Sequence, residues 1–443
     1  MSDANNIPSN LPQKRAFTRT IFSDYSFIKK LIWVYFLLLL FEGALRKWFL
    51  PSLSQGLLII RDPIAVWIYF LTFQNNIFPL DNKYLKNLFI FTLMFAFVSF
   101  FFAGTHWATV AYGFRTNLLH FPLIFIMARV MNLQDVILIG KVMMILALPM
   151  TFIVAEQFQA DREDIINVGA GGSGYQLETS GGKVRASGTF SFVTGIVFFY
   201  CFTISFVIHG FISKNLYNKT LPYLGAGATL LAMVTAGSRS VIADCLQVVA
   251  CFGFLAYFKP NEFGKITASV FGLSSVAIVL YSQLDLFKEG IEFLSLRFEE
   301  AANVEGNPIE AFFNRYLEIL MVPYHSLEFE IIGNGLGSAT RAGSTFGGYT
   351  WSENAWRRAF MEGGLFFGFA FIIWRIWITK DLLISCIKAV KSNNHLPIFL
   401  FGATGPILLL GILGQPTNLG FVVFGAGLCL AACKSKKEIV NYQ

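Results

Sequence analysis

Apolar runs of about 20 residues with few or no charges recur along the whole of this 443-residue sequence. An α-helix of that length spans the hydrocarbon core of a bilayer, which is about 30 Å thick. Charged residues make up 14% of the chain, against about 25% in a typical soluble domain. We therefore predict an all-α polytopic membrane protein. This class excludes soluble enzymes and nucleic-acid-binding domains.

Hydropathy predicts about twelve transmembrane helices in a single membrane domain, residues 31–433. The polar segments 1–30 and 434–443 are expected to be terminal tails. The expected helices lie near 31–49, 53–73, 86–104, 107–128, 134–157, 188–212, 220–237, 239–258, 266–284, 358–379, 397–413 and 417–433.

The basic residues between these helices predict how the chain crosses the membrane. Lysine and arginine lie mainly in alternate loops, namely at Lys83, Lys86, Arg129, Lys214, Lys219, Lys259, Lys265, Lys380, Lys388 and Lys391. Since cytoplasmic loops carry the excess of basic residues, both tails are predicted to be cytoplasmic. Arg46 and Lys47 are an exception, because they fall on the outer side.

Two longer polar segments, 158–187 and 285–357, are then expected on the outer face. The first contains GAGGSG and SGG and is expected to be flexible, because glycine has the greatest backbone freedom. In the second, an amphipathic helix is expected near 309–320, where apolar and polar side chains separate onto different faces. Any chemistry is therefore expected on the outer face.

Arg61-Asp62-Pro63 lies in the middle of the second predicted helix. A charge at a helix centre costs about 2.5–3.5 kcal/mol on insertion scales, so each one needs a partner or a water-filled cavity. Adjacent residues on a helix do not face each other, and proline is expected to loosen the helix there. Both a structural ion-pair network and a cavity-lining role remain open. Candidate partners in a network are Glu42, Arg46 and Arg115.

Arginines gather on the outer side, where the positive-inside rule would deplete them. Arg185 and Arg239 lie beside small residues at helix ends, and a guanidinium group suits bidentate phosphate binding. Further outer arginines are Arg297, Arg315, Arg341, Arg357 and Arg358. The alternative is surface arginines that contact lipid headgroups or pair with Glu299, Glu300 and Glu318.

Residues 333–368 combine a glycine triplet, GNGLG, with carboxylates around the start of the tenth predicted helix. The glycines would allow the backbone to approach a ligand closely. Glu353 and Asn354 lie just before that helix and Glu362 just inside it. A carboxylate there could accept a proton from an attacking hydroxyl, or could simply be favoured by the helix dipole.

No metal site is expected, because neither an HExxH motif nor a paired-ligand spacing occurs. Six cysteines lie in or beside apolar runs, which does not suggest a disulfide framework. His106 and His325 are isolated, and a lone histidine is more often structural than catalytic.

The ordered set of motifs resembles the O-antigen ligase/polymerase superfamily over about residues 130–433. The motifs that carry this resemblance are RASGTF at 185–190, GSRS at 237–240, GNGLG at 333–337 and ENAWRRAFMEGGLFFG at 353–368. Near the N-terminus, FEGALRKWFLP and IIRDP are similar to the polysaccharide-polymerase branch rather than to the ligases.

The resemblance implies a glycosyltransferase of the bacterial plasma membrane that needs neither a metal nor another cofactor. Such an enzyme transfers a growing glycan from undecaprenyl pyrophosphate to a lipid-linked repeat unit on the outer face. Arg185 and Arg239 would hold the pyrophosphate as charge develops on it, and weaker candidates are Arg315, Arg341 and Arg357. The implied partners are the lipid-linked oligosaccharide, membrane lipids, a chain-length regulator and a flippase.

One residue departs from the family pattern, because many members carry histidine where this chain has Glu353. A glutamate can do the same work where burial favours its protonated form, so Glu353 is the candidate base. Asn354 would orient it or the acceptor. The alternatives are an O-antigen ligase acting on a lipid A core or a protein, a secondary transporter suggested by Arg61 and Asp62, and a non-catalytic assembly subunit.

Overall fold

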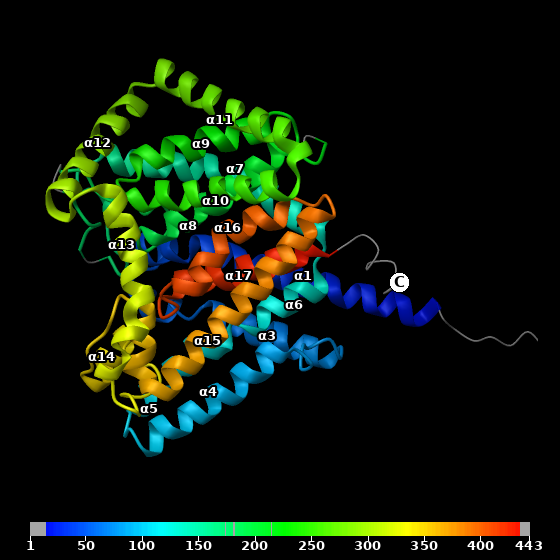
Figure 1. The fold of residues 1–443 in the computed structure, drawn as a ribbon, viewed down its shortest axis with the longest axis vertical. Coiled ribbons are helices and arrows are strands. Elements are labelled where there is room, and N and C mark those ends of the chain that lie inside the picture. The colour runs from blue at the N-terminus through cyan, green and yellow to red at the C-terminus, as the bar shows by residue number, and fades with distance from the viewer. Residues whose placement is uncertain (1–14, 173, 180–181, 214, 435–443) are drawn as a thin grey trace, which may run out of the picture.

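The computed structural model describes residues 15–172, 174–179, 182–213 and 215–434, and within these ranges it is helical with isolated bridges and no strand (Figure 1). The elements of the first half are α1 (Arg15–Ala44), η1 (Leu45–Phe49), η2 (Pro51–Leu53), α2 (Ser54–Leu57), α3 (Arg61–Gln74), α4 (Lys83–Phe101), α5 (Trp107–Phe114), η3 (Arg115–Leu119), α6 (Pro122–Val130), α7 (Leu133–Gln159) and η4 (Ile165–Asn167). Those of the second half are α8 (Thr194–Ile212), α9 (Leu221–Thr235), α10 (Arg239–Phe258), η5 (Pro260–Glu262), α11 (Phe263–Gln283), α12 (Asp285–Glu305), α13 (Pro308–Met321), η6 (Val322–Glu328), α14 (Arg341–Gly347), α15 (Ala355–Lys391), α16 (Leu396–Leu410) and α17 (Pro416–Cys433).

Eight helices in the described part of the chain are long and apolar enough to cross a membrane, which confirms the all-α, membrane-spanning class. They are Pro51–Gln74, α4, α7, α8, α10, Pro260–Gln283, α15 and α17. Helical segments occupy each of the twelve predicted ranges, but α9 and α16 have only 15 residues each. The predicted helix 107–128 is divided among α5, η3 and α6. The count of about twelve spans therefore stays a prediction.

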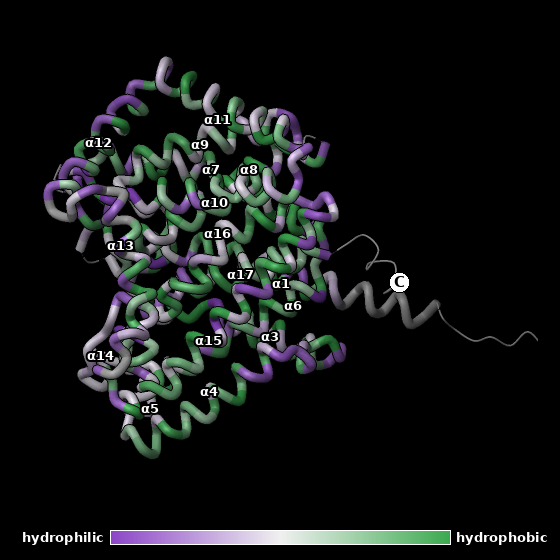
Figure 2. The backbone as a smooth tube through the Cα atoms, in the orientation of Figure 1, coloured by the Kyte–Doolittle hydropathy of each residue, from purple (hydrophilic) through white to green (hydrophobic). Residues whose placement is uncertain are grey.

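The centre of the molecule is α8, where every residue from Gly195 to Ile212 is buried. It packs against α7, α9, α10, α16 and α17. Figure 2 shows much of the backbone in this part of the molecule in green, the colour of hydrophobic residues. Small residues allow these helices to pack closely. Close packing is important in a membrane, because apolar side chains gain little by leaving apolar lipid. Gly140 of α7 lies directly against the ring of Phe206, and a Cβ at Gly225 of α9 would lie 2.9 Å from Val207.

The segment 285–357, which the sequence predicts on the outer face, contains four helical elements, α12, α13, η6 and α14. In Figure 1, α13 runs along one end of the membrane helices, from α12 towards α14. It matches the helix expected near 309–320, and Phe313, Leu317 and Leu320 on it are exposed. The earlier segment 158–187 contains η4 and two isolated bridges, Val168–Tyr175 and Glu178–Val184.

The predicted helix 53–73 is interrupted, which changes the interpretation of Arg61-Asp62-Pro63. The chain forms η2, α2 and a turn before α3 begins at Arg61. Pro63 therefore lies in the first turn of α3, where its missing N–H would have no helical partner, and it does not loosen the helix as expected. Asp62 lies in the same turn, where the helix dipole favours a negative charge.

Candidate functional site

Three arginines from separate elements lie together at one end of the bundle. Arg185 follows a short bridge, and its backbone N–H donates to the Leu177 carbonyl at 2.7 Å. Arg239 is the first residue of α10, and Arg297 lies on α12. Gly237, with φ of +62°, lets the loop before α10 approach Arg185, because a Cβ there would lie 3.5 Å from the Arg185 Cα.

The charges of this arginine cluster act on one another. Partial burial and the charges of Arg297 and Arg239 lower the pKa of the Arg185 guanidinium. Arg297 Nη1 donates to Glu300 at 2.8 Å, and the Arg297 side chain is only 12% exposed. The Nε atoms of Arg185 and Arg297 are buried and have no partner in the described part of the chain. These two unused donors are what an oxyanion bound to the arginine cluster would satisfy.

The segment that carries Arg185 is anchored by the end of α1 and by η1. Lys47 Nζ donates to Ser187 Oγ at 3.0 Å and to the Gly188 carbonyl at 2.5 Å. Arg46 Nη1 donates to Ser191 Oγ at 3.1 Å. The two basic residues that violate the positive-inside pattern are therefore held within the protein. They join the FEGALRKW segment to RASGTF and so position Arg185.

The other predicted site residues lie elsewhere. Glu353 is exposed, and no described contact joins it to Arg185 or Arg239. Asn354 is the N-cap of α15 and accepts from the backbone N–H groups of Trp356 and Arg357, which is a structural role. The remaining candidates are placed as follows: Arg341 stacks over Trp351 at 5.4 Å, Arg357 is exposed, and Arg315 lies on α13 with its side chain outside the described part.

The GNGLG segment approaches protein backbone rather than open space. Gly335 and Gly337 have φ of +94° and +82°. The N–H of Gly335 donates to the Glu362 carbonyl at 2.9 Å, and that of Gly337 donates to the Glu362 carboxylate at 3.1 Å. Arg358 Nε also donates to this carboxylate, at 2.7 Å. Glu362 thus holds the loop and α15 together, and the glycines allow this packing.

Neither lone histidine occupies a site that suggests catalysis. His106 Nδ1 accepts from the Ala108 N–H at 3.3 Å at the start of α5, and its ring stacks on Phe346. His325 is exposed, with Nδ1 3.7 Å from Glu328. Within the described residues, no group of three or more His, Cys, Asp or Glu side chains could hold a metal ion.

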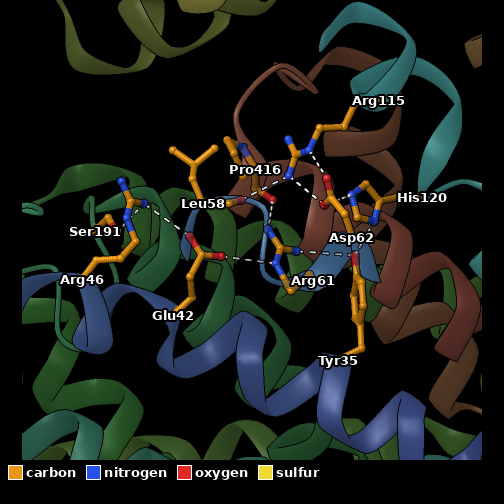
Figure 3. A network of polar contacts seen from close by, with 10 residues as sticks. All are labelled: Tyr35, Glu42, Arg46, Leu58, Arg61, Asp62, Arg115, His120, Ser191 and Pro416. Atoms are coloured by element: carbon orange, nitrogen blue, oxygen red, sulfur yellow. Dashed lines mark hydrogen bonds and ion pairs between the residues drawn. The ribbon is translucent and has the colours of Figure 1, made fainter. Parts of the chain in front are cut away.

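The charges around Arg61 form a buried network, drawn in Figure 3. Glu42 of α1 accepts from Arg61 Nε and from Arg46 Nη1, both at 3.3 Å. Arg61 Nη2 also donates to the Pro416 carbonyl at 2.7 Å. Arg61 is only 2% exposed, and a Cβ at Gly420 would collide with its guanidinium. These contacts confirm the predicted ion-pair partners and leave no room for a cavity at Arg61.

Asp62 forms the second half of the same network. Arg115 Nη2 donates to Asp62 Oδ1 at 2.9 Å, and His120 Nε2 lies 3.1 Å from the same oxygen. His120 Nδ1 lies 3.2 Å from the Tyr35 hydroxyl, which also accepts from Arg61 Nη1 at 3.4 Å. The two carboxylates therefore connect α1, α3 and the region around η3. Their role in this structure is to hold helices together.

One carboxylate that the sequence motifs do not single out lies within a helix long and apolar enough to cross a membrane. Asp244 is on α10, five residues after Arg239, and is the one acidic residue of that helix. The signal that would have found it is a single acid within an otherwise apolar helix, because such residues are costly in a membrane.

No protein-family model matches this chain, and no curated protein sequence matches it.

Proposed function

We propose that this protein is a polysaccharide polymerase of the bacterial plasma membrane. It transfers a growing glycan from undecaprenyl pyrophosphate to a lipid-linked repeat unit on the outer face. The observation that supports this proposal best is the arginine cluster, Arg185, Arg239 and Arg297, with two buried donors unused. A pyrophosphate leaving group gains negative charge as the bond to the sugar breaks, so preorganised guanidinium groups would stabilise it.

The anchoring of RASGTF supports the same assignment. Lys47 bonds to Ser187 and Gly188, and Arg46 bonds to Ser191, so the segment that presents Arg185 is fixed before any substrate binds. Donors that are already in place need no reorganisation during the reaction, which is the source of their catalytic effect. An acceptor hydroxyl would also need a base, for which exposed Glu353 is the candidate from the sequence.

The first experiment needs no knowledge of the sugar. The gene is deleted, and lipid-linked oligosaccharides and total surface polysaccharide are sized by mass spectrometry. A polymerase predicts that single lipid-linked units accumulate and that long polymer is missing. Long polymer that stays on undecaprenyl pyrophosphate would indicate a ligase instead, and an unchanged profile would reject both glycosyl transfer reactions.

The second experiment tests the arginine cluster in the complemented strain. Arg185→Ala is expected to abolish long polymer with an unchanged protein level, because it removes a guanidinium from the centre of the cluster. The matched control is Arg162→Ala, since Arg162 lies in the same outer segment but is exposed and pairs with Glu178. Normal chain length in Arg185→Ala would contradict the assignment.

A secondary transporter gains no support from the charges around Arg61. Arg61 and Arg115 each have a carboxylate partner, and these contacts join helices rather than line a water-filled cavity. A transporter would also show substrate-driven ion flux in vesicles, which a polymerase would not.

A further inference from the structure

A cavity of about 420 Å³ opens between α6, α15 and α17, beside the loop that precedes α4. The helix α17 packs against both α6 and α15, and Leu408 of α16 also lines the cavity. The cavity is separate from the arginine cluster, and its lining residues belong to none of the motifs that support the polymerase proposal. Its role therefore has to be inferred from its own lining.

The lining of this cavity changes from polar to apolar with depth. Ala426, Leu430 and Lys434 line it from α17 at intervals of four residues, so they share one face of the helix. From Lys434 to Ala426 the cavity extends about 12 Å along the helix axis. On α15, Ser385 lines the same end as Lys434, and Ile378 lies about 10 Å deeper. Ala426 and Ile378 are only 1% and 5% exposed, so the inner end is apolar and buried.

Side-chain contacts hold the polar mouth of the cavity in place. Lys434 Nζ donates to the Arg129 and Met131 carbonyls at 2.9 and 3.2 Å, which joins the end of α17 to the end of α6. On the opposite side, Lys83 Nζ of α4 pairs with Asp381 of α15 at 3.2 Å. These contacts connect one wall to the next. The mouth is therefore a fixed feature of the fold.

The mouth carries an excess of positive charge. Among the described residues, the charged side chains that line it or pair with its lining are four basic residues and two carboxylates, namely Lys83, Arg129, Lys380 and Lys434 with Asp81 and Asp381. Basic pockets between membrane helices on the cytoplasmic side bind anionic lipid headgroups. The positive-inside rule assigns this end of α15 and α17 to the cytoplasm. The charge of the mouth therefore matches an anionic headgroup.

We propose that this cavity binds an anionic phospholipid, with its phosphate near Arg129 and Lys434 and one acyl chain along α17 towards Ala426. Water at the inner end would lack polar partners, whereas an acyl chain would fill it with apolar contacts. A zwitterionic lipid fits the inner end equally well but gains less at the positive mouth. The bound lipid contacts α6, α15 and α17 together and stabilises their packing. This inference does not rest on the proposed polymerase function.

The first test uses purified full-length protein in detergent and native mass spectrometry. Phosphatidylglycerol and phosphatidylcholine with the same acyl chains are titrated separately, and phosphatidylglycerol is expected to bind more tightly. Lys434→Gln is expected to lower the affinity for phosphatidylglycerol about fivefold and to leave that for phosphatidylcholine unchanged. The matched control is Lys388→Gln, since Lys388 lies near the same end of α15 but is exposed and does not line the cavity. This control should bind both lipids as wild type does.

A second variant tests the acyl chain. Ser385→Leu puts a larger apolar side chain into the cavity, and Ser275→Leu on α11 is its matched control, because both hydroxyls donate to the carbonyl four residues earlier at 2.8 Å. Ser385→Leu is expected to lose tight binding of phosphatidylglycerol, while its melting temperature without added lipid stays near that of Ser275→Leu.

Three results would overturn the proposal. They are equal affinity of wild type for the two lipids, unchanged phosphatidylglycerol binding in Ser385→Leu, and binding of glycerol phosphate as tight as that of phosphatidylglycerol. The last result would show that the anion alone occupies the mouth and that no acyl chain enters the cavity. If Ser385→Leu does not fold, the comparison of the two lipids and the effect of Lys434→Gln still decide the matter.

Discussion

A single glycine controls how α1 meets the segment that carries Arg185. A Cβ on Gly43 would collide with the backbone of Thr189, Phe190 and Ser191. Backbone atoms cannot move aside as a flexible side chain can, so only glycine fits there. The close approach also lets the Thr189 hydroxyl donate to the Leu40 carbonyl at 2.6 Å. Gly43 is therefore part of the support for the site.

Gly43→Ala is expected to destabilise the protein although alanine is the better helix former. Overpacking of this kind costs about 1–3 kcal/mol, and it would push RASGTF and Arg185 out of place. Thermal unfolding in detergent and polymer length in cells both measure the effect. Gly56→Ala is the control, since a Cβ there meets nothing within 4 Å. Equal behaviour of the two variants would show that the contact at Gly43 does not matter.

Sequence reasoning at this scale succeeds where charges are few. Glu42 and Arg115 could be predicted as the partners of Arg61 and Asp62, and Arg46 as a member of the same network through Glu42, because buried charges in apolar helices need partners of opposite charge. The grouping of Arg185, Arg239 and Arg297 could not be derived in the same way. They lie on segments separated by more than 50 residues, and no periodicity relates such segments.

Among the elements, α15 extends 12 residues beyond the end of its predicted range, 358–379. It runs from Ala355 to Lys391, and its backbone breaks at Gly364, where φ is 61° and ψ is −160°. The break leaves backbone N–H groups without a partner inside the helix. One of them, the N–H of Leu365, donates instead to the carbonyl of Glu330 in the preceding loop at 3.0 Å. A pair of glycines inside an apolar run does not by itself predict a break in the helix. The break depends on the preceding loop, which packs against Gly364.

Gly364→Ala is expected to disturb this junction. Alanine is strained in that backbone region, at a cost of about 1–3 kcal/mol, and a Cβ would approach the Glu330 carbonyl at 2.6 Å. The melting temperature in detergent should fall, and the loop 330–337 should become more open to proteolysis. Gly253→Ala on α10 serves as the control, because its surroundings are open and a helical alanine should be neutral or stabilising. Unchanged melting of Gly364→Ala would mean that the break is not needed.

For the whole molecule, the orientation in the membrane decides whether the proposed chemistry is possible. Undecaprenyl-pyrophosphate-linked glycans are polymerised on the outer face, so the arginine cluster must lie there. The part of α15 that follows the break at Gly364 is about 40 Å long, and α15 separates α14 at one end from Ser392 at the other. The basic residues Lys388 and Lys391 lie near the Ser392 end, which the positive-inside rule assigns to the cytoplasm.

Cysteine labelling tests this orientation directly. Thr345 and Ser392 are both exposed, one on α14 and the other just after α15, so each can carry an introduced cysteine. Thr345→Cys is expected to react with a membrane-impermeant maleimide on intact cells stripped of their outer layers. Ser392→Cys should react only after the membrane is permeabilised. Background labelling is low because five of the six native cysteines are buried and Cys433 is half-buried.

The reverse pattern would place α14 on the cytoplasmic side. Because α13 links the region of α14 and η6 to α12, which carries Arg297, the arginine cluster would then also face the cytoplasm. A donor on the outer face could not reach it, and the polymerase proposal would be rejected. The expected pattern is consistent with the polymerase proposal, since the arginine cluster would face the side on which the lipid-linked glycan is presented.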